Sequence, residues 1–198
     1  MAGFKTRNLP ARLGATLTAA AAATAVAVSP GLAQATDSSA GSSTASAAAR
    51  HCAVLVGPSN DGRPSPVLAQ ACDDTSAATA RARTLQAAAK AGRNANTTPR
   101  LATVLMTLYS DTNYRGTSHQ VLGSAGTCDR AGYRIGLAQW QLSPWMYILS
   151  SIKRAGACNK ARVTNRASTH SESFDLSVPY LGSLLNDNVG VIWVYNRA

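Results

Sequence analysis

The chain has 198 residues, a formal net charge of +10 at pH 7, and aromatic side chains at 6% of its positions. A basic surface of this kind can associate with acidic polymers, including cell-wall polymers and anionic lipid head groups. The sequence argues against a nucleic-acid-binding protein, because its basic residues are scattered and it has no zinc finger, no basic-region zipper and no RNA-binding aromatic motif.

The first 35 residues have the pattern of a secretory signal peptide. A basic start is followed by an apolar, alanine-rich run and by the small-residue sequence AQA at 33–35. We expect cleavage after Ala35, with the sequence ASA at 45–47 as the alternative site. A membrane anchor is disfavoured because Pro30 interrupts the run and no second apolar segment follows. The sequence therefore predicts a secreted, extracellular protein with no stable membrane span after cleavage.

All four cysteines lie beyond the predicted signal peptide, at Cys52, Cys72, Cys128 and Cys158. An even number of cysteines in an exported chain indicates two disulfides, and four cysteines permit three pairings. Chain order and the flanking strands favour Cys52 with Cys72 and Cys128 with Cys158. Each of these closed loops would contribute about 3 to 4 kcal/mol to stability. The spacing excludes a zinc site, because no two cysteines lie close together and the histidines are isolated.

The segment before the main domain divides into a leader and an extension. Residues 36–50 are almost wholly small and polar, so we expect a flexible leader. Residues 51–100 form the N-terminal extension, in which apolar runs at 53–56 and 66–71 predict a hairpin clasped by the first disulfide. A helix is predicted from 76 to 91. Because its apolar face is nearly all alanine, we expect it to be held weakly, as a linker or as a piece removed on maturation.

The remaining segment, 101–198, has the pattern of short strands separated by turn residues. In the run LATVLMTLY, which begins it, Val104, Met106 and Leu108 share one face of a strand and alternate with a more polar face. Similar strands separated by Gly and Pro follow to the C-terminus, which favours a sandwich over a helical fold.

The stretch LYSDTNYRG at 108–116 contains a specific hairpin pattern. Tyr109 and Tyr114 stand on either side of four small polar turn formers, which predicts that the chain reverses here. Gly116 permits a backbone conformation closed to residues with a Cβ, and Ser118 can fasten the bend.

These residues resemble the Greek-key motif of the βγ-crystallin family, in which a serine fastens a folded-over hairpin. A second unit, aligned by placing Tyr109 over Thr164, keeps only Ser173 of this pattern, so we expect its hairpin to be looser. The whole arrangement is similar to small secreted βγ-crystallin-like proteins of actinobacteria. The resemblance covers the last half of the chain. It implies an all-β, βγ-crystallin-like sandwich of two Greek-key motifs in 101–198, preceded by the clasped hairpin and a short helical linker.

The resemblance also implies calcium ligands, because many family members bind calcium through one segment in each unit. One segment supplies a hydroxyl at its fifth position and a carbonyl at its third, and the other supplies a carboxylate at its second. Oxygen donors of this kind suit a hard cation. The segments here are MYILSS at 146–151 and NDNVGV at 186–191. They would combine Ser150, the carbonyl of Ile148 and Asp187 in one site.

The second calcium site is expected to be lost. It would need a carboxylate where Tyr147 stands and a hydroxyl where Gly190 stands. We therefore expect at most one weak calcium ion and no other cofactor. In the alternative interpretation, both segments only begin strands and bind no cation.

The tryptophans are a second group of candidate binding residues. Trp193 alternates with Val191 and Tyr195, which favours packing. Trp140 and Trp145 lie in AQWQLSPWMY, a connection that contains proline, and we expect this stretch to be the exposed patch.

The sequence favours a function without catalysis. It has no nucleophile elbow and no HExxH motif, and its histidines lack local partners. We expect a secreted, non-enzymatic, disulfide-stabilised βγ-crystallin-like protein with a binding or stress-related role. One alternative is a peptidase inhibitor or antimicrobial toxin. An inhibitor would present the clasped hairpin, with Arg63 near its tip, to an extracellular protease. Another is a cell-wall-binding module that uses the positive charge and exposed tryptophans on a wall polymer.

Overall fold

The structure is a computed structural model that describes residues 51–95 and 102–197. The predicted signal peptide at 1–35 and the predicted leader at 36–50 lie outside the described residues. All described residues belong to one compact unit, Thr44–Ala198. Within them, no helix has the length and apolar character needed to cross a membrane.

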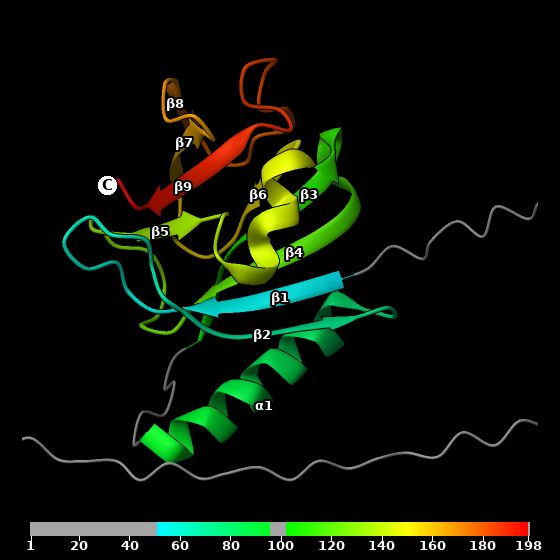
Figure 1. The fold of residues 1–198 in the computed structure, drawn as a ribbon, viewed down its shortest axis with the longest axis vertical. Coiled ribbons are helices and arrows are strands. Elements are labelled where there is room, and N and C mark those ends of the chain that lie inside the picture. The colour runs from blue at the N-terminus through cyan, green and yellow to red at the C-terminus, as the bar shows by residue number, and fades with distance from the viewer. Residues whose placement is uncertain (1–50, 96–101, 198) are drawn as a thin grey trace, which may run out of the picture. The chain divides into compact units, whose positions relative to one another are not determined.

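The described residues form two sheets, one α-helix and two 3₁₀-helices (Figure 1). In chain order the elements are β1 (His51–Val56), β2 (Val67–Asp73), α1 (Ala77–Ala95), β3 (Thr103–Asp111), η1 (Thr112–Tyr114), β4 (Arg115–Gly123), β5 (Tyr133–Gly136), η2 (Trp140–Tyr147), β6 (Ser151–Arg154), β7 (Lys160–Asn165), β8 (Ser171–Asp175) and β9 (Val189–Tyr195). The five-stranded sheet has the order β2-β1-β4-β3-β6, and the four-stranded sheet has the order β5-β9-β7-β8.

The two sheets exchange strands between the two repeated units. β3, β4 and β6 lie in the five-stranded sheet, but β5, which lies between β4 and β6 in sequence, pairs with β9 in the other sheet. In return, Val178, which lies between β8 and β9, pairs with Ile152 of β6. The third strand of each unit therefore crosses to the opposite sheet, as in two Greek-key motifs that form a sandwich. The predicted fold class is confirmed.

The main core lies between the sheets and follows the alternation of the strands. In β9, for example, Ile192 and Val194 are fully buried, while Trp193 between them faces away from the core. The largest fully buried side chains of this core are Leu105, Met106, Leu108, Ile135, Leu137, Leu142, Leu149, Ile152, Leu181 and Leu185. The alternating patterns therefore place one apolar face of each sheet in a shared core.

The turn between β3 and β4 has the predicted bend. Tyr109 and Tyr114 pack edge to face with their ring centroids 6.0 Å apart. Gly116 has a φ of +77°, and a Cβ at this position would lie 2.2 Å from Oγ of Ser110. Both the backbone conformation and the space therefore require glycine here.

The hydroxyl that fastens this hairpin comes from β6. Oγ of Ser151 accepts a hydrogen bond from the N–H of Tyr114 at 3.1 Å and donates to the carbonyl of Asp111 at 2.6 Å. Ser118, which we expected to fasten the bend, instead places its Oγ 2.8 Å from Nδ1 of His51 in β1. In this chain Ser118 therefore links the Greek-key unit to the extension.

The hairpin between β7 and β8 is held by an asparagine side chain. Oδ1 of Asn165 accepts hydrogen bonds from the N–H groups of Thr169 at 2.9 Å and His170 at 3.1 Å. Ser168, which directly precedes Thr169, has a φ of 57°. This asparagine anchors the turn, which differs from the looser hairpin that we expected from the missing glycine.

The extension is part of the five-stranded sheet. β1 pairs antiparallel with β2 and parallel with β4, so that the hairpin adds two strands to the edge of the Greek-key unit. Cys52 and Cys72 are directly opposite each other on β1 and β2 and form a disulfide with a Cα–Cα distance of 4.0 Å. The second disulfide joins Cys128 to Cys158. Both predicted pairings are confirmed.

Helix α1 covers the outer face of this added hairpin (Figure 1). A second small core forms there from Ala53, Leu55, Ala69, Ala80, Ala88 and Leu122, with Leu85 packed against it. The hydroxyl of the fully buried Thr84 lies 3.0 Å from the carbonyl oxygen of Ala53. The alanines therefore let the helix approach the sheet closely, whereas we expected an alanine face to hold it weakly.

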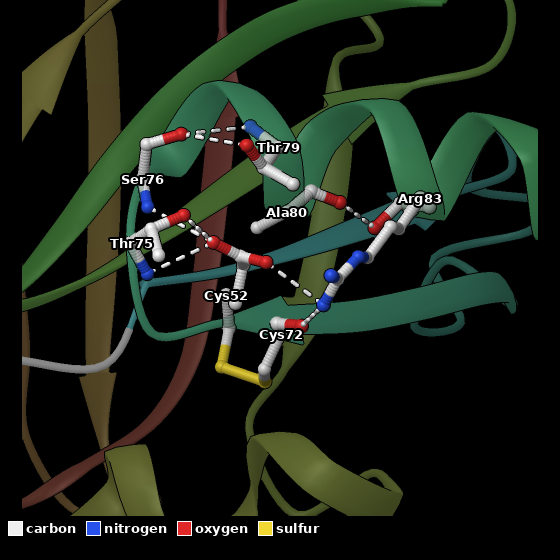
Figure 2. A network of polar contacts seen from close by, with 9 residues as sticks. Cys52, Cys72, Thr75, Ser76, Thr79, Ala80 and Arg83 are labelled. Atoms are coloured by element: carbon white, nitrogen blue, oxygen red, sulfur yellow. Dashed lines mark hydrogen bonds and ion pairs between the residues drawn. A yellow bond between two sulfur atoms is a disulfide. The ribbon is translucent and has the colours of Figure 1, made fainter.

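The junction of β2 and α1 is held by one carboxylate. Oδ1 of Asp73 accepts hydrogen bonds from the Thr75 hydroxyl and from the N–H groups of Thr75 and Ser76. Arg83 adds an ion pair, with Nη1 2.8 Å from Oδ2 of Asp73, and Figure 2 shows Thr75, Ser76 and Arg83 gathered beside the disulfide. The pKa of Asp73 is lowered to about 2, mainly by the hydrogen bond from the Thr75 hydroxyl.

We predict that Gly116→Ala destabilises the protein much more than Ser171→Ala. The alanine would be strained at positive φ and would clash with Ser110, a cost of about 2 kcal/mol or more. Ser171 is exposed and bonds only the hydroxyl of Thr164, so its replacement should cost no more than about 0.5 kcal/mol. Denaturant melts of the two variants measure the difference, and equal losses would contradict this account of the bend.

We also predict that the effect of Asp73→Asn depends on pH. A carboxyl whose pKa is lowered by folding stabilises the native state above its unfolded pKa of about 3.9, and this contribution is lost as pH falls through the folded pKa. The variant should therefore melt below the wild type at pH 7, and the gap should narrow between about pH 4 and pH 2. Asp61→Asn in the exposed turn is the control. A gap independent of pH would argue against the capping role.

Candidate functional site

The structure brings the two main calcium candidates together. Oγ of Ser150 lies 3.5 Å from Oδ1 of Asp187. The Ser150 hydroxyl also donates to the carbonyl of Ser110 at 2.8 Å, and Oδ2 of Asp187 accepts from the side chain of Asn186 at 2.7 Å. Ile148, the source of the expected carbonyl, is 37% exposed. The structure thus brings one carboxylate and one hydroxyl together, and the described residues contain no cluster of three or more His, Cys, Asp or Glu.

The place of the second candidate site is taken by an arginine. The guanidinium carbon of Arg166 lies 4.3 Å from the centroid of the Tyr147 ring. Nε of Arg166 donates to Oδ1 of Asn188 at 3.0 Å, and its backbone N–H donates to the Asn188 carbonyl at 3.2 Å. A fixed positive charge therefore lies between the two segments where carboxylate and hydroxyl ligands are missing. The pattern of the two segments gives no sign of Arg166, because this residue precedes both β8 and the second segment.

The loop of the clasped hairpin is held at its base. Ser65, which is 1% exposed, donates its N–H to the carbonyl of Arg134 in β5 at 2.6 Å, and its hydroxyl accepts from the N–H of Arg134 at 3.1 Å. Oγ of Ser59 donates to the carbonyl of Arg63 at 2.7 Å. Arg63 is exposed. The loop thus presents an arginine from a backbone that is tied to the sandwich.

The tryptophans lie in different surroundings from those expected. Trp145 is only 6% exposed and packs edge to face against His119, so the predicted exposed patch is wrong at this position. Trp193 lies on the outer face of the four-stranded sheet, stacked on Tyr195 rather than in the core. The side chain of Trp140 lies outside the described part of the structure. Both parities of β9 are apolar, so the sequence alternation did not show which parity faces the core.

The outer face of the four-stranded sheet gathers aromatic and basic side chains. Trp193 stacks on Tyr195 with a centroid distance of 4.5 Å, and its Nε1 donates to the carbonyl of Ala131 at 2.8 Å. In the strand register, Arg134 of β5 and Arg162 of β7 lie opposite Trp193 on its two sides. The guanidinium carbon of Arg134 is 5.2 Å from the Trp193 ring centroid. The arginine–tryptophan face consists of Arg130, Arg134, Arg162, Trp193, Tyr195 and Arg197.

Two hollows flank the aromatic pair on this face. One has a volume of about 230 Å³ and includes Arg134 and Arg162 in its lining. The other has a volume of about 490 Å³ and includes Arg130 and Arg197. Each hollow is therefore lined by two arginines together with Trp193.

The charges of the arginine–tryptophan face are not neutralised within the described residues. None of its four guanidinium groups forms an ion pair there. Asp175 is paired with Lys160, and Asp129 accepts the N–H of Gly132 at 2.8 Å. The face therefore combines an apolar platform with four positive charges available to a ligand.

One serine and histidine pair has the spacing of a nucleophile and its base. Oγ of Ser118 is 2.8 Å from Nδ1 of His51. Ser118 is only 6% exposed, so a substrate has no open approach to its hydroxyl. This geometry fits a structural contact between β1 and β4.

Among known proteins, the chain is similar to several solved βγ-crystallin domains. No protein-family model and no curated protein matches the chain. A double mutant of a βγ-crystallin domain from Clostridium beijerinckii is similar, at 20% identity and a TM-score of 0.37 over 47% of this chain and 98% of that one. A βγ-crystallin domain from Flavobacterium johnsoniae is similar at 19% identity and a TM-score of 0.35, over 48% and 97%. A clostrillin double mutant in complex with nickel is similar at 18% identity and a TM-score of 0.38, over 48% and 100%.

Proposed function

We propose that the protein is a secreted, non-enzymatic, βγ-crystallin-like module that binds an anionic glycopolymer of a cell wall. The observation that carries this proposal is the arginine–tryptophan face, on which four arginines that form no ion pair within the described residues surround a fixed aromatic pair. The two disulfides support an extracellular location, because such bonds persist in oxidising compartments.

The chemistry of the face suits an acidic glycopolymer. Arginine presents a planar fork of donors that matches the oxygens of a carboxylate or a phosphate. Because Trp193 and Tyr195 stack on each other and Arg134 lies over the Trp193 ring, the apolar contact left for a sugar ring is the remaining face of Tyr195 and the edges of the pair. Because the hydrogen bond from Trp193 to Ala131 and the stacking fix these rings in advance, little conformational entropy is lost on binding.

The held loop favours a second candidate function, inhibition of an extracellular peptidase. A rigid loop loses little entropy when it enters a protease cleft. Arg63 is exposed on such a loop, and the disulfide between Cys52 and Cys72 closes the other end of the hairpin. The variant Arg63→Ala distinguishes the two functions, because it would abolish inhibition of a peptidase that cleaves after arginine.

We predict that Arg162→Ala weakens binding to purified wall teichoic acid about tenfold or more. The variant loses a charge-assisted hydrogen bond worth about 1.5 to 3 kcal/mol, and each 1.4 kcal/mol corresponds to a factor of ten in Kd. Trp193→Ala should weaken binding similarly, and added salt should weaken binding of the wild type. Isothermal titration of the oxidised protein measures these changes.

The control for this prediction is Arg154→Ala, which removes one exposed charge from β6 in the other sheet. Neutral dextran should not bind. Equal losses for Arg154→Ala and Arg162→Ala would mean that net charge alone drives association. Tighter binding of a single-stranded oligonucleotide than of teichoic acid would also contradict the proposal.

We further propose that Ser150, Asp187 and the Ile148 carbonyl hold one weak calcium ion. A site with a single carboxylate should bind no tighter than about 10⁻⁴ M, near the weak extracellular end of calcium modules. Calcium titration of the wild type should show one such event, which Asp187→Ala abolishes and Glu172→Ala leaves intact. Two tight sites, or binding that survives Asp187→Ala, would refute this geometry.

A further inference from the structure

A cavity opens on the inner face of the five-stranded sheet, away from the arginine–tryptophan face. Its volume is about 530 Å³, within the range of small-molecule sites. It is lined by Cys52, Gln70, Cys72, Thr117, His119, Ser143, Pro144, Trp145 and Ile148. These residues come from β1, β2, β4, η2 and the residue that follows η2.

The strand register explains why the space is there. Val121 belongs to the main core between the sheets, and His119 and Thr117 share its face of β4. Val54 of β1 also belongs to that core, and Cys52 shares its face. β1 and β2 therefore continue the inner face past the Greek-key unit, where η2 lies against it.

Two polar side chains in the lining lack partners. His119 is fully buried, and neither of its ring nitrogens has a hydrogen bond; Oε1 of Gln70 is also buried without a partner. The His119 ring packs against Trp145, at a centroid distance of 5.5 Å and an angle of 90°. Native proteins pair the large majority of such atoms. A ligand or an ordered water that enters the cavity would supply these hydrogen bonds.

The lining also defines the charge of such a ligand. It contains no Asp, Glu, Lys or Arg, and the disulfide, Pro144, Trp145 and Ile148 form apolar walls. Burial lowers the pKa of His119 to about 3, so its ring is neutral near pH 7, with one donor and one acceptor nitrogen. The unsatisfied acceptors are therefore Oε1 of Gln70 and one nitrogen of His119, and both require a neutral donor.

We propose that this cavity binds a neutral, mainly apolar small molecule with a hydroxyl or N–H group that donates a hydrogen bond to His119 or Gln70. A phenol or an indole has this combination of an apolar ring and a single donor. An anionic ring compound should bind much more weakly, because the lining offers no positive charge to compensate a buried carboxylate. This site is independent of the polymer-binding function, since it lies on the other sheet.

The test uses the oxidised, secreted protein with phenol, indole, toluene and benzoate as probes. Saturation-transfer NMR and thermal shift should show saturable binding of phenol and indole and none of benzoate. His119→Phe keeps an aromatic ring but removes both nitrogens, and it should weaken phenol at least about fivefold while leaving toluene unchanged. If the phenol donates to Gln70 instead, Gln70→Leu should be the variant that weakens phenol, and it also serves if the first variant does not fold. The matched control is Gln120→Leu, which removes another unpartnered glutamine oxygen on the opposite face of β4.

Several outcomes would overturn the proposal. The first is no saturable binding of phenol or indole. The second is phenol affinity that neither His119→Phe nor Gln70→Leu lowers, which would leave His119 as a packing residue against Trp145. The third is a loss of phenol binding in Trp193→Ala, which would place the probe on the arginine–tryptophan face.

Discussion

The parallel pairing of β1 with β4 is the contact on which the rest of the structure depends. It joins His51 to Ser118 and Val56 to Gly123 along the whole of β1, and His51 and Ser118 also share a side-chain hydrogen bond. Without this pairing, the Greek-key unit would end at β4, and its edge groups would be open to other chains. With it, the disulfide-clasped hairpin becomes the edge of a five-stranded sheet. The extension and the sandwich then form one continuous structure.

A sheet that is extended in this way has two further faces to cover. Helix α1 covers the outer one through alanines and Thr84, and Asp73 holds the start of the helix against β2. On the inner one, η2 supplies Leu142 and Trp145 to the core but leaves the cavity around His119. The outer face of the four-stranded sheet has no covering element among the described residues. The arginine–tryptophan face and the cavity around His119 are therefore the places where sheet surface was left incompletely covered.

The sequence predicted the features that depend on local chemistry. The bend at Gly116 follows from a positive φ that glycine tolerates, and the two disulfides follow from chain order. Apart from the approach of Ser150 to Asp187, which the family resemblance implied, it did not predict contacts between segments distant in the chain. The β1–β4 pairing has no local pattern, and an alanine face on α1 gives little indication of what it packs against. Trp145 was expected to be exposed but is buried, and Trp193 was expected to pack inside but lies on an outer face. These environments, and the position of Arg166, depend on which distant segments fold together.

The most direct test of this account is native-state hydrogen exchange of the oxidised protein. Amides of a cooperative unit exchange through the same opening reaction, whereas a separate, weaker unit exchanges faster. If the extension is integral to the sheet, the paired amides of β1 and β4 should exchange as slowly as those of β9 in the centre of the other sheet. Fast exchange throughout β1 and β2, with β3 and β9 still protected, would show that the extension is a separate appendage and would contradict the account.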